Sequence, residues 1–267
     1  MADELDEIRE NEEANYQVSL KLLGDSVSLV QDLVDLYKLM VEIASKSTLA
    51  ARNEFFTGLH FLTASRYHLT IGALAALRAH ISDAQRSGRM AIELAAFAAL
   101  IKRQPALAMV WLNAGQDEAS YKRYRRTFTS QNLFPDDDPL LKSLGDRFDT
   151  TSKLSHPSVY SLAEHTRITR GESALNLEFH YFTVKKDSAR EPTLTYFWTV
   201  DTHFGMLRVF EQVLSETLEG DRAHWDISRN GVDAKLGVHK QRWKDVILGQ
   251  KSRQGPSPTG QIIVPPF

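Results

Sequence analysis

The sequence predicts a mainly α-helical protein, a bundle of long antiparallel helices that carries a small antiparallel β-sheet as a minor appendage. Three observations support this fold class. Apolar residues recur at spacings of three and four over most of residues 16–154. The run from Ser82 to Leu112 is apolar on nearly every side, which is typical of a helix at the centre of a helical domain. A block rich in aromatic and β-branched residues follows near position 165.

Two long amphipathic helices come first. The first is predicted over residues 16–46, where two adjacent apolar seams form a stripe wide enough to contact two neighbouring helices. Ser47 or Thr48 can cap the second, over residues 49–80, and the short connection makes the two helices antiparallel neighbours. The polar, acidic residues 1–15 lack an apolar stretch, so we expect a disordered lead-in there and no signal peptide.

The central helix is predicted from Ser82 to Gln104. Ser82 and Gln85 match a capping box, and the helix ends at Gln104 because a residue before proline is pushed out of the helical conformation. Its uncharged stretch is far shorter than the roughly 20 residues of a membrane span, so we expect no membrane partner. Arg89 and Glu93 lie four residues apart on one face, and form either a buried polar site or, more commonly, a plain ion pair.

The second half of the chain contains shorter elements. They are helices at 105–113, 117–130, 138–154 and 201–218, and strands at 165–170, 174–184 and 193–199. Asp138 and Asp201 are the caps of two of these helices. Residues 16–220 therefore form a single helical-bundle domain with a β insertion at about 165–200, and residues 221–267 a polar C-terminal extension with a flexible tail.

The composition of the sequence excludes several classes of function. The 267 residues carry a net charge of −2, unlike a strongly basic nucleic-acid binder, and 42% are hydrophobic, enough for a sizeable core. The absence of cysteine removes disulfides, thiolate metal ligands and cysteine nucleophiles, and it fits the reducing cytoplasm where we expect the protein to reside. Signatures of nucleotide binding, zinc proteases and α/β-hydrolases are missing, so we predict no cofactor and no metal.

One helix end carries a combination of residues suited to acid–base chemistry. Asp149, Ser152 and His156 share a helical face, because a helix turns by about 100° per residue. A carboxylate there can orient the imidazole, with a hydroxyl beside it. The alternative is that His156 interacts with the helix end as a cation, while Ser152 and Asp149 are solvated.

The segment Tyr121–Arg126 is a dense basic patch with interleaved aromatic residues. Arginine forks can bind phosphate oxygens, and tyrosine rings can stack on bases. The alternative is a solvated helix face whose tyrosines pack inward at a spacing of three. The candidate residues for binding RNA or another phosphate-bearing ligand are Lys122, Arg123, Tyr124, Arg125 and Arg126.

The order of these features resembles a known group of proteins. Long helices are followed by a helix with Arg86, Arg89 and Glu93, a proline-led short helix, a tyrosine-rich helix and the run Phe148-x3-Ser152-x3-His156-Pro157-Ser158. Over roughly residues 50–165 this order resembles bacterial helical proteins loosely related to the HEPN superfamily. Members are four-helix domains, and many are metal-independent ribonucleases that carry an Arg and, a few residues later on the same helix, a His. In this sequence eight residues separate Arg147 from His156, which places the two on opposite faces.

We therefore expect an intracellular helical protein that acts as a binding or regulatory component. The alternative is a metal-independent, HEPN-like ribonuclease or toxin of a defence system, so whether the protein is an enzyme stays open. The expected partners are RNA or a phosphate-bearing ligand, and a second copy of the chain that pairs through the long helices. In the enzyme alternative, the candidate catalytic residues are His156, Arg147, Ser152, Asp149, Arg89 and Glu93.

Overall fold

The structure is a computed structural model that describes residues 2–155, 166–170, 175–179 and 190–251. It is mainly helical, as the sequence predicts. The helices are α1 (Ala2–Leu23), α2 (Ser28–Ser45), α3 (Asn53–Leu77), α4 (Ile81–Arg103), α5 (Leu107–Leu112), α6 (Glu118–Thr127), α7 (Ser130–Leu133), α8 (Pro139–Ser155), α10 (Arg190–Val213), α11 (Ser215–Leu218) and α12 (Arg222–Lys251). Short 3₁₀ turns occur at η1 (Gly24–Val27), η2 (Thr48–Ala51) and η3 (Glu219–Asp221). Among the described helices, none has the length and apolarity that crossing a lipid bilayer requires.

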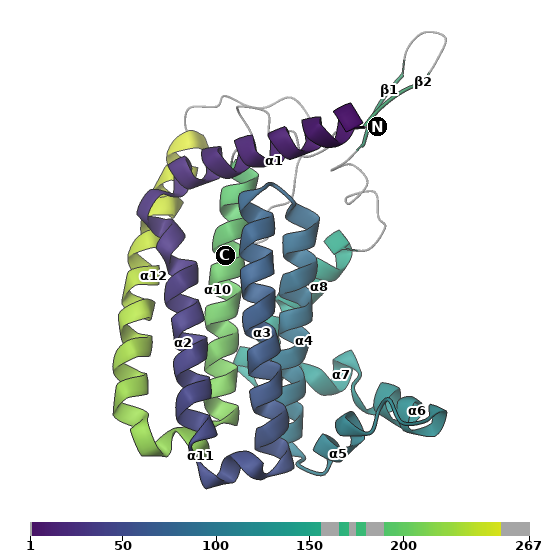
Figure 1. Cartoon of the computed structure of the whole chain (residues 1–267), viewed down its shortest axis with the longest axis vertical. Coiled ribbons are helices and arrows are strands. Elements are labelled where there is room, and N and C mark those ends of the chain that lie inside the picture. The colour runs from purple at the N-terminus through teal and green to yellow at the C-terminus, as the bar shows by residue number, and fades with distance from the viewer. Residues whose placement is uncertain (1, 156–165, 171–174, 180–189, 252–267) are drawn as a thin grey trace.

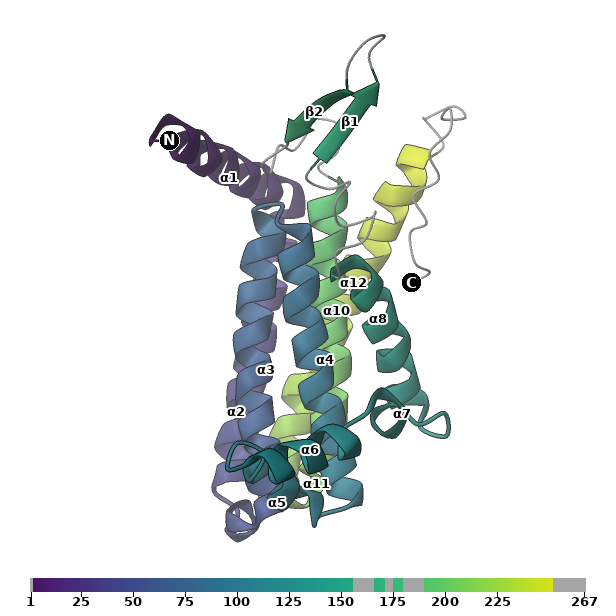
Figure 2. The same cartoon turned by 90° about the vertical axis from the view of Figure 1, so that its right-hand side faces the viewer.

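The long helices α2, α3, α4, α10 and α12 run along the vertical axis in both views, and α1 crosses their upper end (Figures 1 and 2). At the centre, α4 packs against α3, α8 and α10, so the predicted hub is confirmed. Most of its buried side chains are small, which lets neighbouring backbones approach closely, and the larger ones are Ile92, Leu100 and Ile101. The buried alanines of α4 are Ala84, Ala91, Ala95, Ala96, Ala98 and Ala99.

The two ends of α4 test the prediction in detail. The helix ends at Arg103 with Gln104 as its C-cap, as the following proline predicts. It begins at Ile81, one residue early, and no side chain caps it from position 80, so the predicted capping box of Ser82 and Gln85 is wrong. The α3–α4 turn contains Ala79 in the left-handed conformation, with φ of +65°.

Two predictions near the N-terminus are wrong. Residues 2–15 form the first half of α1 rather than a disordered lead-in, and Asn15 and Ser19 are buried against the bundle. The single helix predicted over residues 16–46 is broken at Gly24, whose φ of +54° lies in the left-handed region that glycine adopts without strain. The chain therefore turns at η1, and α1 and α2 are separate helices.

The predicted three-stranded sheet is not seen. Two short strands, β1 (Thr166–Arg170) and β2 (Leu175–Phe179), pair antiparallel with Ile168 opposite Leu177. The third predicted strand, residues 193–199, belongs to α10 instead, and so does Asp201, which is therefore not a helix cap. The β-branched and aromatic residues that suggested a strand are buried inside the bundle. They include Thr193, Thr195, Tyr196, Phe197 and Thr199.

The described part of the predicted polar extension is a helix that packs on the bundle. α12 contacts α2 and α10, and Trp225 and Leu236 on its inner side are fully buried. Lys235 forms an ion pair with Asp32 of α2, which fixes the outer edge of this contact. The predicted polar extension is therefore a long helix over residues 222–251, whereas the predicted flexible tail, at 252–267, lies outside the described residues.

Candidate functional site

The basic segment predicted from the sequence forms α6, which has no buried residue. Asp117 caps its start, since one carboxylate oxygen accepts a hydrogen bond from the Ser120 backbone N–H at 2.7 Å. Lys122 pairs with Glu118 one turn earlier, at 2.7 Å. The other three cations form no salt bridge with a described residue; they are Arg123, Arg125 and Arg126.

Aromatic packing sets the orientation of α6. The Tyr124 ring is half-buried, with its centroid 6.2 Å from that of Phe97 on α4 and 5.2 Å from that of Phe128. Since Tyr124 packs inward, the four cations of α6 fall in a sector of roughly 160° on the opposite side. Tyr121 stacks on Tyr124 at 6.2 Å but is itself 50% exposed, so its outer face is open to solvent.

The turn after α6 is tied to the end of the central helix. The side-chain amide of Asn132 donates to the Thr127 carbonyl oxygen at 2.8 Å, and Arg103 of α4 donates to the Asn132 carbonyl oxygen at 3.2 Å. Trp111 of α5 packs edge-on against Phe61 of α3, with centroids 4.7 Å apart. Both α5 and α6 are therefore held in place by contacts outside the basic segment.

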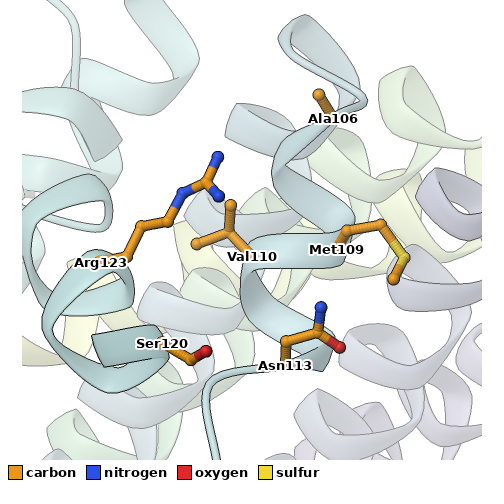
Figure 3. Close-up of a pocket in the computed structure, with 6 residues that line it drawn as sticks. All are labelled: Ala106, Met109, Val110, Asn113, Ser120 and Arg123. Atoms are coloured by element: carbon orange, nitrogen blue, oxygen red, sulfur yellow. The ribbon is translucent and has the colours of Figure 1, made fainter. Parts of the chain in front are cut away.

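A small cavity of about 100 Å³ lies between α5 and α6. Figure 3 shows the Arg123 side chain extending from α6 toward Val110, with Ser120 on the same helix and Asn113 across from it. The lining residues are Ala106, Met109, Val110, Asn113, Ser120 and Arg123. A water molecule needs about 10–15 Å³ on this measure, so the cavity has room for a cluster of waters or one phosphate group. We call this cavity together with Tyr121, Lys122, Arg125 and Arg126 the α6 basic surface.

Glu93 of the central helix lies near Tyr124, on the inward side of α6, and Arg89 lies one turn before Glu93 on the same helix. The Arg89 Nη2 lies 3.8 Å from Glu93 Oε1, both side chains are about a quarter exposed, and the Arg89 guanidinium lies over the Phe148 ring at 4.9 Å. Burial raises the pKa of the Glu93 carboxyl, although the charge of Arg89 opposes this shift. Burial, followed by the charge of Glu93, raises the pKa of Tyr124, so α4 and α6 interact electrostatically here.

Arg147 lies in a different arrangement from Arg89. Its guanidinium donates to Asp201 Oδ2 at 2.7 Å and to the Thr202 hydroxyl at 2.8 Å, both on α10. Lys240 of α12 pairs with the second oxygen of the same carboxylate. Burial by itself would raise the pKa of Asp201, but Arg147 and Lys240 outweigh it and lower the pKa. Arg147 therefore joins α8, α10 and α12 and is occupied by structural partners.

The other predicted acid–base residues do not gather around a described cavity. Asp149 is exposed, and the Ser152 hydroxyl donates to the Phe148 carbonyl oxygen at 2.7 Å within α8. His156, on which the catalytic prediction depends, lies outside the described residues. The acid–base group of residues 149, 152 and 156 therefore stays a prediction.

The sequence did not indicate a second polar cluster, inside the bundle. His203 of α10 is fully buried, and its Nδ1 lies 3.0 Å from the Tyr37 hydroxyl of α2. Burial lowers the pKa of His203 to about 3, with a smaller contribution from His68. At neutral pH the imidazole is uncharged, and its tautomer decides whether Nδ1 accepts from the Tyr37 hydroxyl or donates to it.

Within the part of the chain that the structure describes, no three His, Cys, Asp or Glu side chains gather closely enough to hold a metal ion. The polar residues that sequence reasoning missed are Asn113, which reaches Arg123 only through the α5–α6 turn, and Ser120, which lies one turn before Arg123 on α6. No protein-family model, curated protein or solved structure matches the chain.

Proposed function

We propose that the protein is a binding component that holds single-stranded RNA through the α6 basic surface. The observation that carries this proposal is the exposure of Arg123, Arg125 and Arg126 without a carboxylate partner among the described residues. Exposed Lys and Arg side chains usually form an ion pair with a nearby carboxylate or lie on a surface where charges of both signs are interspersed. In this chain, whose net charge is −2, the concentration of unpaired arginines on one short helix favours an anionic ligand.

The side chains beside the three arginines indicate which class of anion binds. A guanidinium binds phosphate oxygens through two parallel hydrogen bonds, and Arg123 reaches a cavity that the Asn113 amide also lines. The Ser120 hydroxyl in the same cavity donates to Asp117 Oδ2 at 3.2 Å. Tyr121 presents a half-exposed ring beside these cations, and such a ring stacks on unpaired bases regardless of their identity. Phosphate contacts with one stacked base support single-stranded RNA over a duplex, whose bases are already stacked on each other.

The test is fluorescence anisotropy with a labelled single-stranded RNA at low salt. We expect the triple variant Arg123→Gln, Arg125→Gln, Arg126→Gln to raise the Kd by about tenfold or more, since three phosphate contacts are lost. The matched control removes three exposed positive charges elsewhere, through Lys21→Gln, Lys38→Gln and Arg208→Gln. An equal loss of affinity in both triple variants, or no binding by the wild type, would remove the α6 basic surface as the binding site.

The ribonuclease alternative is a second proposal with its own support. Glu93 has a raised pKa, lies 3.8 Å from Arg89, and is close enough to Tyr124 to raise the pKa of that ring, so a carboxyl group and a guanidinium lie on the inward side of α6. Cleavage would be measured on a single-stranded RNA in the presence of a chelator. If the alternative holds, Glu93→Gln and His156→Ala each reduce cleavage while the Kd stays unchanged. If the RNA is intact after incubation with the wild type, the ribonuclease alternative is excluded and the binding function is the proposal that remains.

A further inference from the structure

The outer side of the α3–α4 hairpin is apolar and faces solvent. Tyr67, Ile71 and Leu74 of α3 are 62, 38 and 39% exposed, and Met90 of α4 is 47% exposed. A Cβ on Gly72 would lie 3.4 Å from Ser87, so the two antiparallel helices place Met90 level with the first part of this stripe. Single exposed apolar residues are ordinary, but a continuous row of them on one face indicates a surface that another element covers.

A groove adjoins this stripe at the upper end of the hairpin. Its volume is about 460 Å³, enough for more than one large side chain. Ile71, Leu74 and Ala75 form its apolar part. Arg78 and Arg86 are the cations at its edge, and the remaining lining residues are His80, Asp83 and Ser87.

The charge of this surface restricts what can bind it. Residues 55–82 contain no Asp or Glu, although they include Arg66, Arg78 and three histidines. Asp83, the carboxylate that lines the groove, pairs with Arg86 at 2.8 Å. A partner with apolar side chains and carboxylates would therefore complement the surface, whereas a basic partner would be repelled.

The chain itself contains such an element in the first half of α1. Leu5 is 66% exposed and Ile8 is partly exposed, and Asp6, Glu7 and Glu10 are exposed beside them. This half of α1 projects away from the bundle in both views (Figures 1 and 2). It therefore combines exposed apolar residues with a net negative charge, whereas residues 55–82 of the α3–α4 surface carry no carboxylate.

The second half of α1 already contacts the end of the same groove within its own chain. The Glu12 carboxylate lies 2.8 Å from His80 Nε2, and the Arg78 guanidinium lies over the Tyr16 ring at 5.0 Å. Asn15 also donates to the Arg78 carbonyl oxygen at 3.4 Å. The acidic helix thus recognises one end of this surface, while the rest of the groove, at Ile71 and Leu74, is open.

We propose that the α3–α4 groove binds the first half of α1 from a second copy of the chain, residues 5–13. Leu5 and Ile8 of the partner would cover Ile71 and Leu74, and the partner's acidic side chains would face Arg78, because Arg86 already pairs with Asp83. A second copy is the occupant that the observations favour, because both complementary elements lie on one chain. A two-fold axis then forms the same contact twice and doubles the buried area.

The test is the molar mass in solution, measured by size-exclusion chromatography with light scattering over a range of concentrations. The wild type should have a mass close to twice the 30.2 kDa of one chain at the higher concentrations. Ile71→Glu should reduce the mass to that of one chain. The matched control is Ile227→Glu, which changes a 73% exposed isoleucine on α12 and should leave the dimer intact.

A second variant keeps the test independent of any folding defect at Ile71. Glu7→Arg with Glu10→Arg changes only exposed side chains of α1, and it should dissociate the dimer in the same way. A wild type that has the mass of one chain at every concentration would overturn the proposal. A dimer that survives both Ile71→Glu and the α1 double variant would overturn it equally.

Discussion

The guanidinium of Arg147 and the carboxylate of Asp201 form a hydrogen-bonded ion pair at 2.7 Å that joins α8 to α10. Less than a third of either side chain is exposed, and Lys240 of α12 pairs with the same carboxylate. Three helices that are distant in sequence therefore meet at one charged group. Arg147, a candidate catalytic residue from its sequence position, is held by a structural partner.

Replacing Arg147 with methionine should destabilise the fold without affecting RNA binding. The change leaves Asp201 with only one of its two cationic partners, so we expect the free energy of unfolding to fall by about 1–3 kcal/mol in urea titrations. Arg9→Met is the matched control, because its pair with Asp6 is largely exposed and should contribute less than about 0.5 kcal/mol. If Arg147→Met leaves the stability unchanged but abolishes RNA binding, Arg147 contributes to the binding site and its structural role is contradicted.

Gly88→Ala should be strongly destabilising, since the added Cβ would lie 2.6 Å from the Trp198 ring. Overpacking of this kind costs about 1–3 kcal/mol, which chemical denaturation would detect. Gly231→Ala is the opposite case on α12, because nothing lies within 4 Å of the new Cβ. Alanine favours the helix over glycine, so the free energy of unfolding should rise by up to about 1 kcal/mol. Tolerance of alanine at position 88 would mean that α4 and α10 are not in close contact.

Ala79→Gly should stabilise the α3–α4 turn. Ala79 has φ of +65°, and the His80 N–H donates to the Ala75 carbonyl oxygen at 2.9 Å, the hydrogen bond of a helix end that normally uses glycine. Glycine adopts the left-handed conformation without the strain that alanine has there, so the free energy of unfolding should rise by about 1 kcal/mol. Thermal or urea denaturation would measure this change. Gly24→Ala, at φ of +54°, should have the reverse effect. A loss of stability in Ala79→Gly would contradict the described turn.

The buried His203 predicts a loss of stability in acid. The unfolded chain protonates this imidazole below its ordinary pKa of 6.5, whereas the folded protein keeps it neutral down to about pH 3. Unfolding is therefore favoured as the pH falls through this window, by up to about 1.4 kcal/mol per unit. His203→Gln removes the titrating group, so its stability should fall by about 2 kcal/mol less than that of the wild type between pH 7 and pH 5. Identical pH dependence in both proteins would show that the imidazole is not buried as described.

Local chemistry explains which parts of the fold could be predicted. The alanine-rich run at α4 predicted a central helix because no other position could bury it, and Asp138 was predicted as a cap because its carboxylate can reach the next backbone N–H groups. Asp138 Oδ1 accepts from the Leu140 and Leu141 N–H groups at 3.0 Å each.

Tertiary context decided the parts that were missed. The threonines and aromatic residues of α10 favour a strand by local propensity, yet they lie buried against α4 and the other long helices, and this packing overrides the propensity. The apolar stripe of α12 was hidden because its members are widely spaced among polar residues. It consists of Trp225, Val232, Leu236 and Trp243.

The residues of the candidate site could also be predicted only in part. The basic residues of α6 could be identified because they are adjacent in the sequence. The partner of Arg147 could not, because Asp201 lies 54 positions away and only the packing of α8 on α10 brings the two together. Asn113 joins Arg123 only after the chain turns between α5 and α6, whereas Ser120 lies one turn before Arg123 on the same helix.

The most direct measurement of the central claim is the dependence of RNA affinity on salt. Each phosphate contact to a single strand contributes about 0.7 to the slope of log Kd against log salt concentration, so the three arginines contribute about 2 to the slope of the wild type. The slope of the Arg123→Gln, Arg125→Gln, Arg126→Gln variant should be smaller by about 2, because Lys122 is the cation of the α6 basic surface that it keeps. The same slope in both proteins, or a wild-type affinity that salt does not change, would contradict binding of RNA at the α6 basic surface.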